Sequence, residues 1–297
     1  MADPFRPPLT EPGPQAGPGS PVEPVETWRP RLVALDIDGT LLIPDLVAGF
    51  SSEEVTPAVR RAVDAVIAAG VPVVLASGRA PLSMASVLDH LDIPRVPGEQ
   101  VLVVASNGAV TFSYPPINVV AEVTFDARRA VEAVLEHVPD AAVAVEEHGV
   151  GYRVNRHFPE GELGGEMILT PLEEMVASEV SRVIIRDPNS TSEDFVRLAE
   201  KLGLQGTNYF IGWTAWLDLA PEGISKASAL ADVAARLGVD QADVLAIGDG
   251  RNDIEMISWA GRGVAMGQSP DEVKEAADHV TAPVEQDGVA LELHRWF

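Results

Sequence analysis

The sequence predicts an α/β protein built on a doubly wound parallel sheet, Rossmann-like in type, with a smaller α+β domain inserted into it. Three observations carry this prediction. Short apolar runs alternate with helical patterns near both ends of the 297-residue chain, polar clusters follow those runs directly, and the middle of the chain loses the alternation. Alternating strands and helices are typical of a parallel sheet covered on both faces, and the change of rhythm indicates a second folding unit.

The N-terminal part of the parallel sheet begins with a clear strand pattern. The run Leu32–Ile37 is almost entirely apolar until it reaches a carboxylate, as expected of a strand buried on both faces. Thr56 and Pro57 then suit the N-cap and the first position of a helix, and Gly70 is suited to end it. The next expected elements are a strand at 71–76, a helix after Pro81 and a strand at 101–105.

The same rhythm returns near the C-terminus, so we expect both ends to share one sheet. The elements expected there are a helix at 226–237, a strand at 244–247, a helix through Ile254 and Met256, and a strand at 263–265. Between the two ends we expect an inserted α+β domain whose strands are largely antiparallel. Its expected strands are 142–145, 151–154, 182–185 and 209–213, and its expected helices are 127–136 and 192–202.

These patterns divide the chain into four predicted segments. They are a Pro-rich tail at 1–29, the first part of the core at 30–119, the inserted domain at 120–213 and the second part of the core at 214–297. Prolines and glycines dominate the tail and large apolar residues are few, so we expect it to be disordered. Its removal is therefore expected to leave activity intact.

Composition and charge exclude several classes of function. The formal net charge of −24 repels a nucleic-acid backbone or an anionic membrane, and the basic residues do not cluster. No apolar run reaches the ~18 residues of a spanning helix, and no signal-peptide pattern opens the chain. We therefore expect a cytoplasmic protein with no nucleic-acid or membrane partner. Cysteine is absent, so any metal must have oxygen or imidazole ligands. No pattern defines an oligomeric state.

The first polar cluster is Asp36-Ile37-Asp38-Gly39-Thr40, at the end of the first predicted strand. Ligands bind at this carboxyl edge in open α/β sheets. Carboxylates at positions i and i+2 leave an extended strand on the same side, and Gly39 lets backbone N–H groups turn toward an anion. An ordinary Asp-Gly turn would explain Asp38 and Gly39, but it would not explain the anionic Asp36 within an apolar run. The pair therefore suits a cation.

Three further polar clusters occupy comparable places in the pattern. Ser77-Gly78-Arg79 offers a hydroxyl and a flexible amide to a phosphate oxygen, although Ser-Gly after a strand is more often a plain turn. Lys226 opens a helix, where a cation is unfavourable unless an anion lies nearby, and a single lysine is usually solvated. The loop Gly248–Asp253 carries hard oxygen ligands that suit Mg²⁺ and is too short for an EF-hand. Since strand ends of one parallel sheet are neighbours, we expect the clusters to meet.

Together these residues resemble the haloacid dehalogenase superfamily. The matching motifs, in order, are Asp36-x-Asp38-Gly-Thr40, Ser77-Gly-Arg79, Lys226 and Gly248-Asp249-Gly-x-Asn252-Asp253. The insertion, Ser106–Ala109 and the segments 223–226 and 252–256 are similar to the Cof-type branch, which carries a large α/β cap. The resemblance runs from about Leu32 to the C-terminus and is specific in the core but weak in the cap.

The resemblance implies a Mg²⁺-dependent phosphatase that acts on a small phosphorylated metabolite. It implies that Asp36 is the nucleophile, which becomes an aspartyl-phosphate, and that Asp38 is the general acid and base. The implied Mg²⁺ ligands are Asp36, the main-chain carbonyl of Asp38, Asp249 and Asp253. The implied substrate-binding residues are Thr40, Ser77, Gly78, Asn107, Lys226 and Asn252, with Lys226 also counted as catalytic. A carboxylate and a phosphate dianion repel each other, so Lys226 and Mg²⁺ fit the electrostatic need.

Other functions stay open at this point. A non-catalytic phosphometabolite sensor or interaction protein would use the same fold, and a phosphomutase would share the chemistry. A Rossmann dehydrogenase is disfavoured because no G-x-G-x-x-G follows the first strand. Sugar phosphates, pyridoxal phosphate and flavin mononucleotide all fit as substrates. Remaining features have plain interpretations: solvated side chains for His148 and His157, packing for Trp213 and Trp216, and a mobile loop for 160–166.

Overall fold

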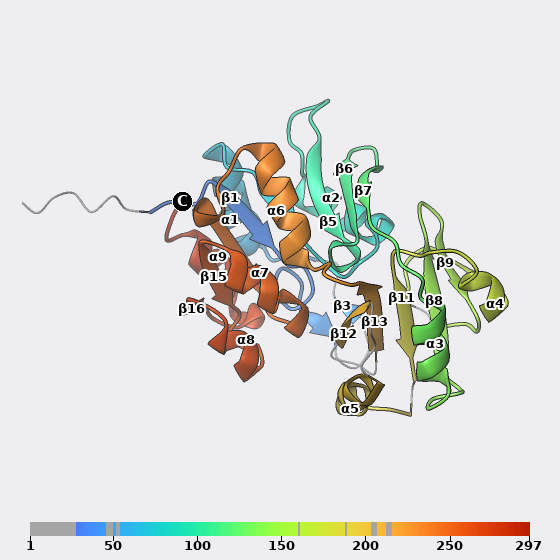
Figure 1. Ribbon diagram of the computed structural model, residues 1–297. Coiled ribbons are helices and arrows are strands. Elements are labelled where there is room, and N and C mark those ends of the chain that lie inside the picture. Colours follow the sequence, from blue (N-terminus) through green and yellow to red (C-terminus); the bar gives the residue numbers. More distant parts are fainter. Residues whose placement is uncertain are drawn as a thin grey trace, which may run out of the picture.

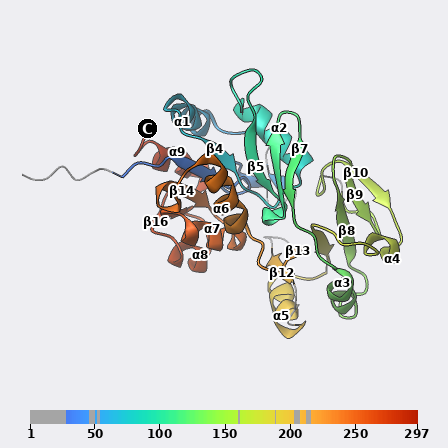
Figure 2. The same ribbon diagram turned by 45° about the horizontal axis from the view of Figure 1, so that its top comes forward.

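The structure is a computed structural model. It describes residues 28–45, 50–51, 54–159, 161–187, 189–202, 207–211 and 216–297. Most of the predicted tail and Trp213 therefore lie outside the described residues. In both views the elements form two groups, a core that contains the C-terminus and a unit beside it built from the middle of the sequence (Figure 1, Figure 2). No helix in the described part of the chain is long and apolar enough to cross a membrane.

A five-stranded parallel sheet lies at the centre of the core. Its strand order is β16-β15-β14-β1-β4, and every pairing is parallel. The strands are β1 (Leu32–Leu35), β4 (Val73–Leu75), β14 (Val244–Gly248), β15 (Arg262–Ala265) and β16 (His279–Val280). Because β1 lies between β4 and β14, the two ends of the sequence pair within one sheet, as predicted.

Helices cover both faces of this sheet. They are α1 (Pro57–Ala68), α2 (Pro81–Leu91), α6 (Lys226–Leu237), α7 (Ile254–Trp259), α8 (Asp271–Glu275) and α9 (Gly288–Leu293). Val33 and Leu35 belong to the apolar cluster with α1, α2 and α9, whereas Leu32 and Ala34 belong to the cluster with α6 and α7. Alternate residues of one strand thus enter two cores, which confirms the doubly wound prediction. Short 3₁₀ turns occupy Ser106–Gly108, Gln241–Asp243, Arg251–Asp253 and Val284–Gln286.

Local capping explains where the helix α1 begins. The Thr56 side chain accepts a hydrogen bond from the backbone N–H of Val59, and Pro57 occupies the first turn. After the helix, Gly70 has a φ of +74°, a conformation that glycine adopts without strain. The predicted N-cap and the predicted stop are therefore both confirmed.

A second, antiparallel sheet departs from the prediction for residues 101–105. It consists of β5 (Val101–Ala105), β6 (Val110–Tyr114) and β7 (Asn118–Glu122). The strand β5 meets the end of β4 through one parallel bridge, Ala76 with Val104, and otherwise pairs antiparallel with β6. The hydrogen-bonding groups of β5 are used by β6, the next strand in the chain, instead of by β4. The apolar run 101–105 alone does not reveal which strand β5 pairs with. A two-stranded ribbon joins β2 (Pro44–Asp45) and β3 (Phe50–Ser51).

The inserted unit is a six-stranded sheet with helices on one face. Its strand order is β10-β9-β8-β11-β13-β12, and only β9 and β10 pair in parallel. The strands are β8 (Ala142–Glu147), β9 (Gly151–Val154), β10 (Glu166–Leu169), β11 (Val183–Arg186), β12 (Thr207–Ile211) and β13 (Trp216–Pro221). The helices are α3 (Arg128–Leu135), α4 (Leu172–Met175) and α5 (Ser192–Leu202). The prediction of a largely antiparallel α+β insertion is confirmed.

Two strands of this unit lie outside the predicted pattern. The predicted end of the insertion, residue 213, falls between β12 and β13, which are neighbours in the sheet. The sheet therefore continues to Pro221, and β13 was missed because Asp218 and Pro221 interrupt its apolar pattern. The strand β10 begins at Glu166, where we predicted the end of a mobile loop.

Trp28 belongs to the predicted tail, yet it contacts the core. Its indole Nε1 donates to the carbonyl of Ala242 at 2.8 Å, and its ring meets Trp296 edge-on with centroids 4.8 Å apart. We expect Trp28→Ala to lower the free energy of unfolding by about 1–3 kcal/mol, because a partly buried aromatic loses packing and a hydrogen bond. Urea unfolding measures this, with the exposed Arg29→Ala as the control. Equal midpoints for both variants would contradict it.

Candidate active site

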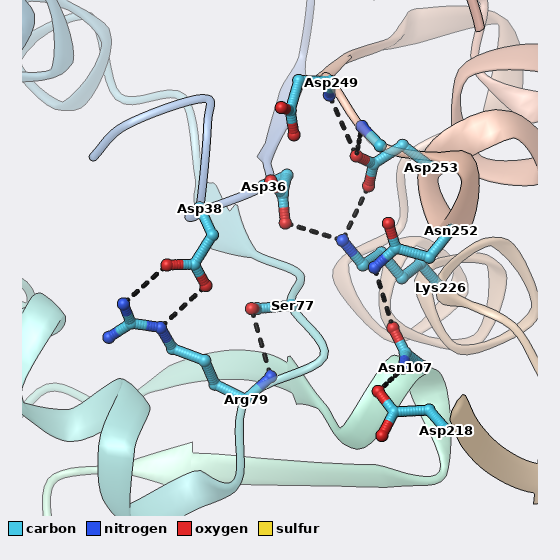
Figure 3. A network of polar contacts seen from close by, with 11 residues as sticks. Asp36, Asp38, Ser77, Arg79, Asn107, Asp218, Lys226, Asp249, Asn252 and Asp253 are labelled. Carbon is cyan, nitrogen blue, oxygen red and sulfur yellow. Dashed lines mark hydrogen bonds and ion pairs between the residues drawn. The ribbon is translucent and has the colours of Figure 1, made fainter. Parts of the chain in front are cut away.

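Polar side chains converge at the carboxyl edge of the parallel sheet (Figure 3). Asp36 follows β1, Ser77 comes shortly after β4, and Asp249 follows β14. Lys226 begins α6 and reaches the same place. The four polar clusters therefore meet at one edge of the sheet, as expected.

Three buried carboxylates form the centre of this region. Asp36, Asp249 and Asp253 are 4%, 2% and 0% exposed, and each offers an oxygen within 4.8 Å of the others. Oδ2 of Asp253 accepts from the backbone N–H groups of Asp249 and Gly250 at 3.0 and 2.9 Å, which fixes the turn after β14. A Cβ on Gly39 would stand 2.0 Å from Oδ2 of Asp249, so only glycine lets the two loops approach this closely.

Lys226 neutralises part of this charge. Its ammonium is fully buried and donates to Oδ1 of Asp36 at 2.6 Å and to Oδ1 of Asp253 at 2.7 Å. These anions resolve the unfavourable position of a cation at a helix start. The helix itself is secured by Ser225 and Ser228, which form a reciprocal capping box. The interpretation of Lys226 as an ordinary solvated lysine is therefore wrong.

The pKa shifts follow from burial and crowding. Burial, together with the Asp253 carboxylate, raises the pKa of Asp36 to about 7 against the opposing effect of Lys226. Burial and the Asp36 carboxylate raise the pKa of Asp249 well above its ordinary value. Burial alone would lower the pKa of Lys226, but Asp253 and Asp36 raise it, so the ammonium stays charged. With all three acids ionised, one ammonium would leave a net negative charge buried, and the raised pKa of Asp36 and Asp249 reflects the cost of that charge.

Asp38 lies outside the carboxylate group. Its two oxygens accept from Nε and Nη2 of Arg79 at 2.8 and 2.6 Å, a bidentate pair (Figure 3). Its side chain is 41% exposed, in contrast to the buried Asp36. The sequence pattern predicted that the carboxylates of Asp36 and Asp38 would form a pair able to hold a cation; in the structure they hydrogen-bond different partners, Lys226 and Arg79. Asp36 hydrogen-bonds Lys226, and the carboxylates that raise its pKa are Asp253 and, to a smaller extent, Asp38.

The predicted phosphate-binding residues surround the carboxylates. The buried Ser77 accepts from the backbone N–H of Arg79 at 3.2 Å, and Thr40 is buried with no hydrogen-bond partner for Oγ1 among the described residues. Oδ1 of Asn107 accepts from Nδ2 of Asn252 at 3.0 Å. A Cβ on Gly78 would stand 3.1 Å from Oδ1 of Asn107, so Gly78 lies against that amide. The ten predicted site residues thus occupy one region, with Asp38 at its more exposed side.

Sequence reasoning missed two residues that contact this region. Nε2 of Gln268 donates to the carbonyl of Gly39 at 2.6 Å and lies 3.4 Å from Oδ2 of Asp249. Asp218, on β13 of the inserted unit, accepts from Nδ2 of Asn107 at 3.3 Å (Figure 3). An acid within the apolar strand β13 was the available signal for Asp218, whereas Gln268 follows β15 without any comparable pattern.

His148 is not the solvated side chain that we expected. Its Nδ1 lies 3.1 Å from Oε1 of Glu146 and its Nε2 lies 2.6 Å from Oε1 of Glu122. These carboxylates, Glu146 first, raise the pKa of His148 to about 9, although burial opposes them. His157 is exposed, as predicted, and Trp216 packs edge-on against Phe158 with centroids 6.1 Å apart, in line with a packing role.

This histidine should make stability depend on pH. Below pH 6.5, the ordinary pKa, both folded and unfolded states carry the proton and the stabilisation is complete. It is lost as the pH rises toward 9, because the unfolded state releases the proton first. We expect a loss of about 1 kcal/mol, since partial exposure screens the pairs. Urea unfolding at pH 6 and pH 9.5 should show a smaller difference for His148→Gln than for the wild type or His157→Gln. Equal differences would contradict this.

Comparisons with known proteins agree with this arrangement. The sequence model of the haloacid dehalogenase-like hydrolase family matches residues 33–293. The chain is 29% identical to the 5-amino-6-(5-phospho-D-ribitylamino)uracil phosphatase YcsE of Bacillus subtilis, over 90% of this chain and 95% of the relative. It is 28% identical to the HMP-PP phosphatase of Cronobacter sakazakii, again over 90% and 95%.

A solved structure shows the same similarity in three dimensions. The structure of BT1666 from Bacteroides thetaiotaomicron, described among phosphatases of the haloalkanoate (HAD) enzyme superfamily, matches with a TM-score of 0.72 and 29% identity. The match covers 94% of this chain and 99% of that chain. Sequence and fold therefore agree over both the core and the inserted unit.

Proposed function

The chain belongs to the haloacid dehalogenase-like hydrolases and is a phosphatase, and we propose that it hydrolyses a small phosphomonoester with Mg²⁺ through an aspartyl-phosphate on Asp36. The observation that carries the proposal is the buried group of Asp36, Asp249 and Asp253 beside the Lys226 ammonium. Two relatives are named for small phosphorylated compounds, which supports a phosphometabolite as the substrate.

The residues fit a magnesium ion. Mg²⁺ prefers hard oxygen ligands, and the group consists only of carboxylates. A divalent cation would also offset the charge that Lys226 leaves unbalanced. Asp36, Asp249 and the main-chain carbonyl of Asp38 would hold the ion, with Asp253 close by. When bound, Mg²⁺ would polarise the phosphoryl group and reduce the repulsion between its oxygens and the attacking carboxylate.

The first half of the proposed reaction transfers the phosphoryl group to the protein. A carboxylate oxygen of Asp36 attacks phosphorus, a new O–P bond forms, and the ester P–O bond breaks. Asp38 would be the general acid: with one oxygen protonated, and so released from its pair with Arg79, it donates that proton to the leaving oxygen and an alcohol departs. Lys226 lies 2.6 Å from Asp36, close enough to orient the nucleophile and to bind a phosphoryl oxygen.

The second half releases inorganic phosphate. Asp38, now a carboxylate, accepts a proton from a water molecule, whose oxygen attacks phosphorus and displaces Asp36. Ser77, Thr40, Gly78, Asn107 and Asn252 would bind the phosphoryl oxygens in both halves. Among these, Thr40 has a buried hydroxyl that no described residue satisfies, which supports a ligand contact.

We assign the inserted unit to the role of a cap. In this proposal the core comprises residues 30–122 and 222–297, and the cap comprises the residues between them. Its six-stranded sheet continues beyond the predicted boundary at 213 to Pro221. Asp218 brings this sheet within hydrogen-bond distance of Asn107, so the cap stands over the phosphate side of the site.

Inorganic phosphate release from a panel of phosphomonoesters tests the proposal. The panel should contain sugar phosphates, pyridoxal phosphate and flavin mononucleotide, each assayed with Mg²⁺ and with EDTA. We expect turnover with Mg²⁺ and loss of turnover with EDTA, restored by added Mg²⁺. Turnover that EDTA leaves unchanged would contradict the magnesium proposal. Binding of the esters without any turnover would favour a sensor instead.

A further inference from the structure

The loop Ser106–Gly108 has an unusual backbone. Three consecutive residues have positive φ angles, of 50° for Ser106, 54° for Asn107 and 101° for Gly108. L-residues other than glycine rarely adopt this region, and two in succession require surroundings that hold them there. The contacts around the loop should therefore indicate what it does.

On the core side, the loop touches three of the four sequence clusters. The backbone N–H of Ser106 donates to the carbonyl of Arg79 at 2.9 Å, and that of Asn107 donates to the carbonyl of Ser77 at 3.1 Å. Gly108 is pressed against the start of α6, where a Cβ would stand 2.1 Å from the carbonyl oxygen of Ser225. The Asn107 amide reaches the fourth cluster through Asn252.

On the cap side, two carboxylates hold the side chains of the same loop. Ser106 Oγ donates to Oε2 of Glu146 at 2.6 Å, and Nδ2 of Asn107 donates to Oδ2 of Asp218 at 3.3 Å (Figure 3). Glu146 lies on β8 and Asp218 on β13, so both come from the six-stranded sheet.

A buried arginine fixes Asp218 within the cap. Nη2 of Arg182 donates to both oxygens of Asp218 at 3.0 and 2.9 Å, and Arg182 is 5% exposed. Burial alone would lower the pKa of Arg182, but Asp218 first, then Tyr152 and Glu146, raise it above its ordinary value, so the guanidinium stays charged. The position of Asp218 is thus set within the cap rather than by the loop, and Oε1 of Glu146 has its own cap partner, Nδ1 of His148, at 3.1 Å.

We propose that Asp218 and Glu146 are positioning residues that shape the phosphate site from the cap, by fixing the Asn107 amide and the Ser106 hydroxyl. A carboxylate can only accept, so Asp218 directs the NH₂ group of Asn107 toward itself and leaves the carbonyl for Asn252. The second N–H of that NH₂ group is then available to a phosphoryl oxygen. This inference rests on the proposed function, since it assigns Asn107 to the phosphate.

Inorganic phosphate is the probe that isolates this effect, because it has no leaving group. We expect Asp218→Asn to raise the inhibition constant of phosphate about tenfold, in line with the loss of one hydrogen bond to a charged group. The new amide would accept from Arg182 through its oxygen and turn its NH₂ toward Asn107, which favours the wrong orientation of that side chain. Ser106→Ala, which removes the donor to Glu146 but leaves Arg182 paired with Asp218, should also weaken phosphate inhibition.

A double-mutant cycle separates positioning from a general loss of stability. If Asp218 acts through Asn107, adding Asp218→Asn to Asn107→Ala should not raise the inhibition constant of phosphate beyond the value for Asn107→Ala alone. The matched control is Glu162→Gln, which removes another cap carboxylate whose ion-pair partner, at 2.5 Å, is Arg186 rather than a residue of the loop. We expect it to leave the inhibition constant unchanged.

Two results would overturn the inference. One is an unchanged phosphate inhibition constant in Asp218→Asn together with a raised KM for the ester. This result would mean that Asp218 contacts the leaving group of the ester instead of positioning Asn107. The other is that Asp218→Asn and Asn107→Ala raise the phosphate inhibition constant independently, by factors that multiply in the double variant. If the wild type hydrolyses no ester, the proposed function fails. The affinities of the wild type and the variants for phosphate can then still be ranked by how much phosphate raises the unfolding temperature of each.

Discussion

Replacing Asp36 by asparagine should reduce phosphate release by a factor on the order of 10⁴ or more. An amide oxygen is a poor nucleophile, and the proposed phosphoryl acceptor is the Asp36 carboxylate. Asparagine keeps nearly the same volume and can still accept from Lys226, whose ammonium is fully buried. The loss should therefore be one of chemistry rather than of folding.

The measurement is single-turnover phosphate release with the best ester of the panel, in the presence of Mg²⁺. The exposed Asp240→Asn is the control, because it removes one carboxylate outside the site. Mass spectrometry of acid-quenched wild type should find a phosphoryl group on the peptide that contains Asp36. Activity in Asp36→Asn within tenfold of the wild type would exclude the covalent route through this residue.

Elements whose signals are local were predictable from the sequence. The helix bounds Lys226–Leu237 and Ser192–Leu202 and the strand Gly151–Val154 agree with the prediction to the residue. Each has its information nearby, such as the Ser225 cap or the Gly238 stop, which has a φ of 67°. The clusters that follow buried strands were also predictable as neighbours, since a parallel sheet brings its carboxyl ends together.

Features that depend on distant partners were not predictable in this way. The strand β5 joins an antiparallel sheet because β6 offers it a continuous partner. Arg79 was part of a recognised motif, but its pairing with Asp38 spans 41 residues. Asp218 looked like an interruption of β13, and only the placement of the cap beside Asn107 gives it a role. Polar residues that act across the junction of two folding units carry no local pattern.

Replacing Asp249 by asparagine should change stability in opposite directions with and without magnesium. Asp249 is buried beside two other carboxylates, and among the described residues its carboxylate accepts a hydrogen bond from Nε2 of Gln268 at 3.4 Å. Without Mg²⁺, the uncompensated charge opposes folding, so we expect the variant to be more stable than the wild type by about 1–3 kcal/mol.

With Mg²⁺ the order should reverse. An ion that binds only the folded state at about one thousand times its Kd stabilises by about 4.1 kcal/mol, which exceeds the expected advantage of the variant, and the wild type should gain this while the variant gains little. Thermal unfolding in EDTA and in a Mg²⁺ series measures both effects, with Asp240→Asn as the matched control. An equal magnesium response in both proteins would remove Asp249 from the ligand set. A variant less stable in EDTA would contradict the charge argument, because crowding of carboxylates is the reason that the site needs a cation.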